Sequence, residues 1–174
     1  MRVARLVLAV VATVFAGACS SSDGPPTGPT VDNAVGPAGG TLSAAGGRVT
    51  LAFPSGAVST NTTITVEVAS SVPASAGLVP GSAYRFSPEG ITFQQPVTLT
   101  VRYDPAALPA GVSDTSLALY KVVDGVWQPA GVSLRDTAAH TVRAAIQGFS
   151  TYGVLGRPPV LADSMMIGPA GGTM

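Results

Sequence analysis

The sequence predicts an all-β fold, an antiparallel β-sandwich, and three observations indicate it. Apolar and polar residues alternate with a period of two in several segments, which is typical of strands with one buried face. Turn signals separate these segments every 8 to 12 residues, and no segment has a helical period. The 21 glycines and 15 prolines of the 174-residue chain also favour short strands over long helices.

Two strands joined by a stiff corner form the centre of this prediction. The first strand covers Arg48–Phe53 and the second covers Thr63–Ala69. Between them, Pro54 restricts one backbone angle and Gly56 frees another, so the chain turns sharply. Each strand carries its apolar residues on one side, namely Val49, Leu51 and Phe53 in the first strand and Ile64, Val66 and Val68 in the second.

The other strands are expected on both sides of this pair along the chain. A glycine-rich turn and a short strand open the domain at Val35–Leu42, and a loop at Ser70–Ser82 follows the central pair. Beyond that loop we expect two short strands within Tyr84–Phe93, a strand at Pro96–Asp104, a crossing loop at Pro105–Ser113, hairpins at Leu117–Gln128 and Leu134–Ile146, and a closing strand at Phe149–Leu155. The Asp124-Gly125 pair marks the tip of the first hairpin. In the strand at Pro96–Asp104, the apolar side consists of Val97, Leu99, Val101 and Tyr103.

Composition argues against nucleic acid as a partner and against a catalytic or metal centre. Basic and acidic residues balance at 9 each, and the sequence has no basic run of the kind that nucleic acid requires. One histidine, one cysteine and two glutamates provide no metal cluster and no Ser-His-Asp set. Isolated aspartates at Asp104, Asp114, Asp124 and Asp136 lack the dense spacing of calcium ligands. The sequence therefore predicts no catalytic residue, no metal and no cofactor.

The first 18 residues have the features of a secretory signal peptide. Arg2 and Arg5 precede an apolar run, Leu6–Phe15, which is too short to span a bilayer as a helix. Cys19, the only cysteine, directly follows Ala16-Gly17-Ala18. This run resembles the lipobox of bacterial lipoproteins, in which the thiol is diacylated and becomes the mature N-terminus. The resemblance implies that the lipid on Cys19 attaches the protein to a membrane.

Secretion without lipid is the alternative. Ala16 stands where a lipobox usually has leucine, and ordinary signal peptidase would cut the same bond. A lone exported thiol without a disulfide partner favours lipidation, and the resemblance then implies, through Ser20, sorting to the outer membrane. Residues 19–33 form a tether rich in Ser, Gly and Pro, which we expect to be disordered because it has no apolar face to bury.

The domain boundaries follow from composition and from an internal repeat. The sandwich is expected at residues 34–156, and residues 157–166 form a linker. Ile167–Met174 repeats Val35–Leu42 with six of eight residues identical. We interpret residues 167–174 as the start of a second, truncated repeat, with a strand donated to a neighbouring molecule as the alternative. A repeat at this period indicates an array of sandwiches.

Five segments carry a family resemblance: GPAGGTL at the start, VTLAFPSGAV, TTITVEV, SPEGITFQQPVTLTV and the closing GFSTYGVL. Together they resemble the ZU-five domain, a β-sandwich of zonula occludens proteins, uncoordinated-type netrin receptors and ankyrins. In ankyrins and receptors the domain mediates protein contact, although the residues of that contact have no match here. Secreted and lipid-anchored bacterial proteins also carry ZU-five domains, so the resemblance is compatible with an exported protein.

Some ZU-five domains cut themselves at a His-Phe-Ser triplet near the last strand. There the serine attacks the preceding carbonyl and the histidine assists proton transfer. The corresponding residues here are Gly148, Phe149 and Ser150, so the base is missing. His140, the only histidine, is expected at the far end of a strand. The resemblance therefore implies a vestigial position that stays uncut.

Trp127 and Tyr120 are the candidates for a ligand platform, because exposed aromatic rings could stack on sugars. A tryptophan two residues beyond a hairpin tip more often packs on its cross-strand neighbour, and we favour that interpretation.

These features predict a non-enzymatic, lipid-anchored cell-envelope protein whose ZU-five-like domain serves protein contact, adhesion or spacing. The alternatives are a carbohydrate-binding module of a larger surface protein and a self-cleaving domain. The expected partners are the membrane, through the lipid, and an unidentified protein or glycan.

Overall fold

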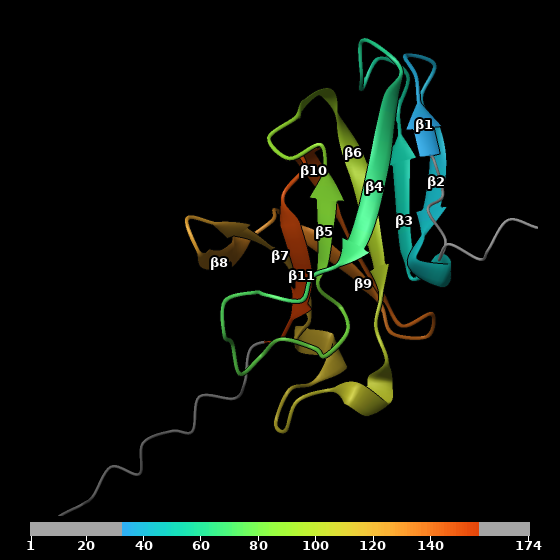
Figure 1. Ribbon diagram of the computed structural model, residues 1–174. Coiled ribbons are helices and arrows are strands. Elements are labelled where there is room, and N and C mark those ends of the chain that lie inside the picture. The colour runs from blue at the N-terminus through green and yellow to red at the C-terminus, as the bar shows by residue number, and fades with distance from the viewer. Residues whose placement is uncertain (1–32, 157–174) are drawn as a thin grey trace, which may run out of the picture.

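The computed structural model describes residues 33–156, which form two antiparallel sheets packed face to face (Figure 1). This arrangement confirms the predicted all-β sandwich. The signal peptide, Cys19, the tether, the linker and the repeated segment lie outside the described residues. Among the residues described, no helix is both long enough and apolar enough to cross a membrane.

The larger sheet has six strands in the order β1-β4-β5-β11-β7-β8. Its strands are β1 (Asn33–Val35), β4 (Thr62–Val68), β5 (Tyr84–Ser87), β11 (Thr151–Leu155), β7 (Ala118–Val123) and β8 (Val126–Pro129). The five-stranded sheet has the order β2-β3-β6-β10-β9. Its strands are β2 (Gly40–Ala44), β3 (Val49–Phe53), β6 (Thr92–Arg102), β10 (Thr141–Gly148) and β9 (Ser133–Asp136). Three short 3-10 turns at Ala45–Gly47, Pro105–Ala107 and Asp114–Ser116 complete the described chain.

Alternation along β3 and β6 of the five-stranded sheet directs the apolar side chains into the core. The predicted inward residues of β3 and of the strand from Pro96 to Asp104 are all buried: Val49, Leu51, Phe53, Val97, Leu99, Val101 and Tyr103. Because β3 and β6 are paired in register, Leu51 lies directly opposite Leu99. Removal of these side chains from water is the main favourable contribution to folding.

The central pair of strands is divided between the two sheets. The corner after Phe53 carries the chain from β3 in the five-stranded sheet to β4 in the six-stranded sheet. The predicted apolar side of the second strand is correct for Ile64, which is 1% exposed, but wrong for Val68, which is 64% exposed. Alternation determines the side of the strand to which a side chain points. Whether that side chain is buried depends also on whether another part of the molecule lies over it.

The two short strands predicted within Tyr84–Phe93 do not form a hairpin. The first is β5 in the six-stranded sheet, and the second is the beginning of β6, which continues without a break through Arg102. Pro96 lies within β6 where the register with β10 shifts between Ile146 and Gly148. A proline is tolerated at such a bulge because no ladder hydrogen bond requires its missing N–H.

Four crossings between the sheets meet at one end of the sandwich. The Gly56 amide donates to the Pro37 carbonyl at 2.8 Å, and the Gln94 amide donates to the Ala57 carbonyl at 3.0 Å. The Phe149 amide donates to the Ile91 carbonyl at 3.2 Å. These bonds connect the β1–β2, β3–β4, β5–β6 and β10–β11 crossings, so the backbone groups of the turns are paired even where the chain leaves a sheet.

An aromatic cluster fills the core beneath these crossings. The Phe149 ring lies 4.9 Å from Phe93, 5.6 Å from Phe86 and 6.5 Å from Phe53, measured between ring centroids. Phe86 also contacts Tyr152 edge to face at 5.7 Å. Such pairs add to the free energy of burial when the rings meet edge to face or offset, and here they join strands of both sheets.

The opening segment Val35–Leu42 passes from the six-stranded to the five-stranded sheet, and a close backbone contact requires glycine at residue 39. Gly39 has φ of +75°, and a side chain there would collide with the Phe53 carbonyl. Val35 and Leu42, at the two ends of the segment, are 7% and 3% exposed. In the repeat, Gly171 matches Gly39 and the two ends remain apolar. The assignment of residues 167–174 to a second copy stays a prediction.

Truncation of the ring at the centre of the cluster tests the packing. We expect Phe149→Ala to lower the free energy of unfolding by about 3–5 kcal/mol, because a large buried ring is lost and a cavity remains. Urea unfolding followed by Trp127 fluorescence measures the change. Val126→Ala on the exposed hairpin is the control, and an equal effect of the two variants would contradict the assigned packing.

Candidate functional site

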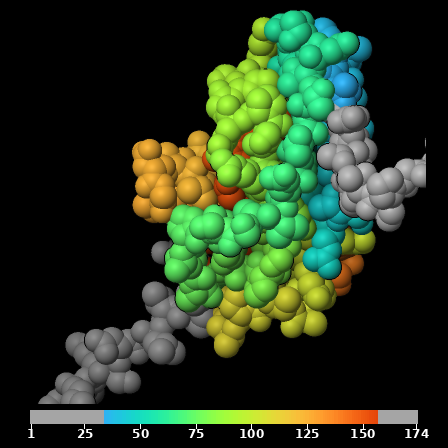
Figure 2. Space-filling view, viewed as in Figure 1, coloured from blue at the N-terminus to red at the C-terminus, as the bar shows by residue number. Residues whose placement is uncertain are grey.

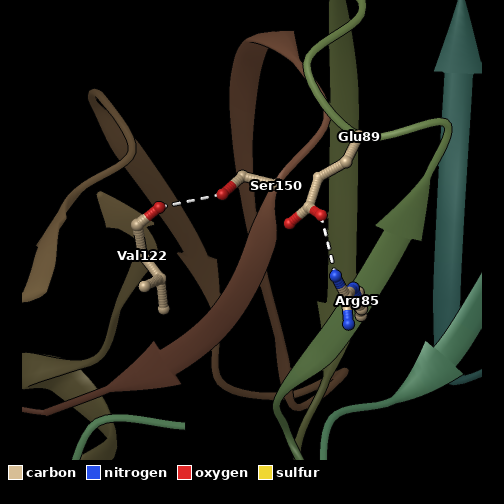
Figure 3. Close-up of polar contacts among 4 residues, drawn as sticks. All are labelled: Arg85, Glu89, Val122 and Ser150. Atoms are coloured by element: carbon tan, nitrogen blue, oxygen red, sulfur yellow. Dashed lines mark hydrogen bonds and ion pairs between the residues drawn. The ribbon is translucent and has the colours of Figure 1, made fainter. Parts of the chain in front are cut away.

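The Gly148-Phe149-Ser150 position lies at the crossing from β10 to β11, directly over the aromatic cluster. The Ser150 hydroxyl donates to the Val122 carbonyl at 2.8 Å, as Figure 3 shows. The carbonyl that a self-cleaving serine would attack, that of Phe149, accepts from the Gly90 amide at 3.4 Å. Ser150 is thus held by a backbone acceptor, which orients the hydroxyl but cannot take its proton.

Gly148 leaves no room for the missing base. A β-carbon at this position would collide with the Ile91 carbonyl, because β6 passes close to the end of β10 here. The Gly148 carbonyl also accepts the Tyr152 hydroxyl at 2.6 Å. Any side chain at residue 148, histidine included, would therefore require the backbone to move.

Other proton-transfer groups are occupied or distant. Glu89 has its carboxylate turned toward Arg85, at 2.8 Å from the guanidinium (Figure 3). His140 precedes β10 and Ser150 follows it. The eight residues of this strand extend roughly 27 Å at about 3.4 Å per residue. Within residues 33–156, His140 is therefore far from Ser150, and the Glu89 carboxylate is paired with Arg85.

Trp127 packs onto the outer side of the six-stranded sheet. Its indole N–H donates to the Pro73 carbonyl at 2.8 Å, and its ring lies over Gly153 in β11. Tyr120 pairs with Gly153 and with Pro129, which makes it a diagonal neighbour of Trp127. Both aromatic residues are half-buried. The geometry thus favours a packing role, in which Trp127 fastens the Ser70–Ser82 loop, over an open stacking platform.

The hairpin that carries Trp127 extends away from the body. Figure 2 shows β8, in orange, projecting from the side of the molecule, with the green loop after β4 lying next to it. The tip has the predicted geometry, with positive φ at both Asp124 (49°) and Gly125 (75°).

Two buried polar atoms lie at the opposite end of β10. The Tyr103 hydroxyl and His140 Nδ1 lack a hydrogen-bond partner within the described chain, and their rings meet edge to face at 5.7 Å. Burial raises the pKa of the Tyr103 hydroxyl, and the Asp114 and Asp136 carboxylates raise it further. Tyr103 lines a pocket together with Arg48, Arg102, Asp104 and Pro105, and His140 is not part of that lining.

The outer face of the five-stranded sheet carries the most regular polar surface. We define this outer face by side chains that point away from the core in two cross-strand rows. The first row is Ser43, Thr50, Thr100, Arg143 and Leu134, and the second is Thr41, Ala52, Thr98 and Ala145. All but the half-buried Thr50 and Thr100 are exposed. The face is thus flat, rich in hydroxyls and accessible.

A groove of about 390 Å³ lies at the β9–β10 end of this face. Its lining includes Thr100, Leu134, Asp136, Thr137, Thr141 and Arg143. One Asp136 oxygen accepts the Ala139 amide at 2.9 Å and fixes the turn between β9 and β10. The volume lies within the range of small-ligand sites, and the polar lining favours a hydrophilic ligand.

The outer face was not singled out by sequence reasoning. The alternating residues Thr98, Thr100 and Arg102 mark the outward side of one strand, but adjacent rows require knowledge of the register. Two of the four isolated aspartates cap turns: Asp104 accepts the Ala106 amide at 2.9 Å, and Asp136 accepts the Ala139 amide at 2.9 Å. Within residues 33–156, no three metal-ligating side chains come together.

Comparisons with known proteins do not identify a relative. No family model matches the chain, and no curated protein matches it. The resemblance to the ZU-five domain therefore stays a prediction, carried by the segments quoted above.

Prolonged incubation tests whether the chain cuts itself. We expect the intact mass to remain unchanged, because the Ser150 hydroxyl is bound to a carbonyl and no base fits at Gly148. Mass spectrometry of the purified chain gives the answer. Fragments that end at Phe149 and begin at Ser150, and that are absent from Ser150→Ala, would contradict this expectation.

Alkaline pH should destabilise the sandwich through Tyr152. Burial raises the pKa of its hydroxyl to about 12 in the folded state, compared with about 10 for an exposed tyrosine. Because the neutral form is favoured by folding, its contribution is complete below pH about 10 and is lost as pH rises toward about 12. Urea unfolding across this range measures the decline, which should be shallower in Tyr152→Phe. Equal slopes for both proteins would contradict the assignment.

Proposed function

We propose that this chain is a non-enzymatic, lipid-anchored protein of the bacterial cell envelope, whose ZU-five-like sandwich serves contact or adhesion. The single observation that carries the proposal is the outer face of the five-stranded sheet. It is broad, regular and exposed, and no described element covers its central residues Ala52 and Thr98. A flat sheet face of small polar side chains suits docking without chemistry.

The arrangement around Ser150 supports a non-catalytic role. The hydroxyl is bound to a backbone carbonyl, and the position of the family's base is closed by the Ile91 carbonyl. The lipid anchor is supported by the sequence around Cys19 alone. A diacylated N-terminus with a tether of Ser, Gly and Pro would leave the sandwich free to meet a partner beyond the membrane.

A carbohydrate-binding role for Trp127 has less support. The indole N–H is already bonded to Pro73, and the ring covers Gly153. Both contacts are internal to the domain, so binding of a ligand at this ring would compete with the packing of the Ser70–Ser82 loop.

An adhesion assay on cells that display the full chain tests the proposal. Ala52→Lys with Thr98→Lys places two long charged side chains at the centre of the outer face, and we expect it to abolish cell–cell or cell–surface adhesion. The matched control is Thr63→Lys with Thr65→Lys, two exposed positions on β4 of the other sheet, which should adhere like the original chain. Cys19→Ser should also abolish adhesion, because the chain would no longer be held at the membrane.

Two results would contradict the proposal. Equal adhesion of the two double variants would exclude the outer face as the contact surface. Failure of the original chain to raise adhesion above that of cells without it would exclude the adhesive role itself. Circular dichroism of each purified variant separates loss of contact from loss of folding.

A further inference from the structure

Arg143 lies at the groove of the outer face and forms no ion pair with any residue in the range 33–156. It lies on β10 between Thr100 on one side and Leu134 on the other. In the described part of the chain, the ion pair joins Arg85 and Glu89 on the opposite side of the sandwich. The exposed guanidinium of Arg143 therefore offers hydrogen-bond donors in a planar fork, which matches a carboxylate or a sulfate.

A second arginine lies next to it. Arg102 on β6 pairs with Thr141, which makes it a diagonal cross-strand neighbour of Arg143, and such residues lie about 7–8 Å apart. Arg102 lines a neighbouring pocket rather than the groove itself. Its Nε donates at 3.4 Å to the carbonyl of Ala139, in the turn between β9 and β10 that borders the groove. Two neighbouring cations repel each other, and a ligand with repeated negative charges would relieve that repulsion.

The groove contains little negative charge that would repel an anionic ligand. Asp136 is the acidic residue of the lining, and one of its oxygens is held by the Ala139 amide at 2.9 Å. The rest of the lining consists of Arg135, Ala138, three threonine hydroxyls and Leu134, which is 55% exposed. Hydroxyls both donate and accept hydrogen bonds, as the hydroxyls of a sugar require, and Leu134 can contact the C–H side of a sugar ring.

We propose that this groove binds an acidic polysaccharide, with Arg143 and Arg102 pairing with successive carboxylates of uronic acid residues. The inference rests on the proposed function and deepens it by naming a ligand class for the same face. A neutral glycan fits less well, because the lining contains no aromatic ring on which an uncharged sugar would stack.

An acidic peptide would match the same positive charges, but it would find no free backbone groups of the sheet to pair with on this face. Peptides that extend a sheet need free N–H and C=O groups at an edge. β6 and β10 are interior strands, each hydrogen-bonded to a neighbour on both sides. A ligand on this face can therefore use only side chains, which favours a polymer that carries its own hydroxyls and carboxylates.

Binding of the purified full-length chain to polygalacturonate tests the proposal by isothermal titration, with dextran as the neutral polymer and poly-L-glutamate as the acidic peptide. We expect polygalacturonate alone to bind. Arg143→Gln should weaken binding by about tenfold or more, since a charge-assisted contact is lost. Arg143→Lys should bind with intermediate affinity, because it keeps the charge without the fork. Arg85→Gln, on the opposite sheet, is the matched control and should bind like the original chain.

Three outcomes would overturn the inference. They are no binding of polygalacturonate, equal weakening by Arg85→Gln, and binding of poly-L-glutamate as tight as that of polygalacturonate. If cells that display the chain still adhere through the outer face, any of these results removes the ligand class and leaves the proposed function standing. If cells that display Ala52→Lys with Thr98→Lys adhere normally, the proposed function fails, whether or not the chain binds polygalacturonate.

Discussion

The packing of Phe149 beneath the sheet crossings is the constraint on which the rest of the structure depends. Its ring contacts Phe53, Phe86 and Phe93, each of which lies near the end of a strand where the chain changes sheet. The same residue bonds through its amide to Ile91. Burial of the ring and pairing of the backbone thus act at one place, and they fix how the two sheets meet.

This constraint also explains why the neighbouring serine is poorly placed for chemistry. β6 must pass close to the end of β10 for Phe93 and Phe149 to meet, and that approach closes the side-chain space at Gly148. Ser150 continues the crossing and satisfies its hydroxyl on the Val122 carbonyl of β7. A turn that cuts itself needs a strained backbone and room for a base beside the serine. Tight packing at this crossing excludes that room.

The two outer faces of the sandwich are used differently. On the six-stranded sheet, Trp127 and the Ser70–Ser82 loop cover Gly153, so part of that face is consumed by internal packing. On the five-stranded sheet, rows of hydroxyls reach solvent beside Arg102 and Arg143. Part of the outer side of the six-stranded sheet is thus used for internal packing, and we assign contact to the five-stranded sheet.

The sequence by itself determined the features that depend on near neighbours along the chain. Alternation placed Val49, Leu51 and Phe53 in the core, and Asp124-Gly125 formed the hairpin tip, because both follow from local backbone geometry. The Gly148-Phe149-Ser150 triplet could likewise be located from the sequence, although not its surroundings.

Only the tertiary structure decided which sheet each strand joins, that Val68 is left exposed, and that Ile91 closes the space at Gly148. It also set the register that brings Arg102 next to Arg143. Each of these depends on a segment that is distant in sequence, and the position of that segment follows from packing of the whole core rather than from local preference.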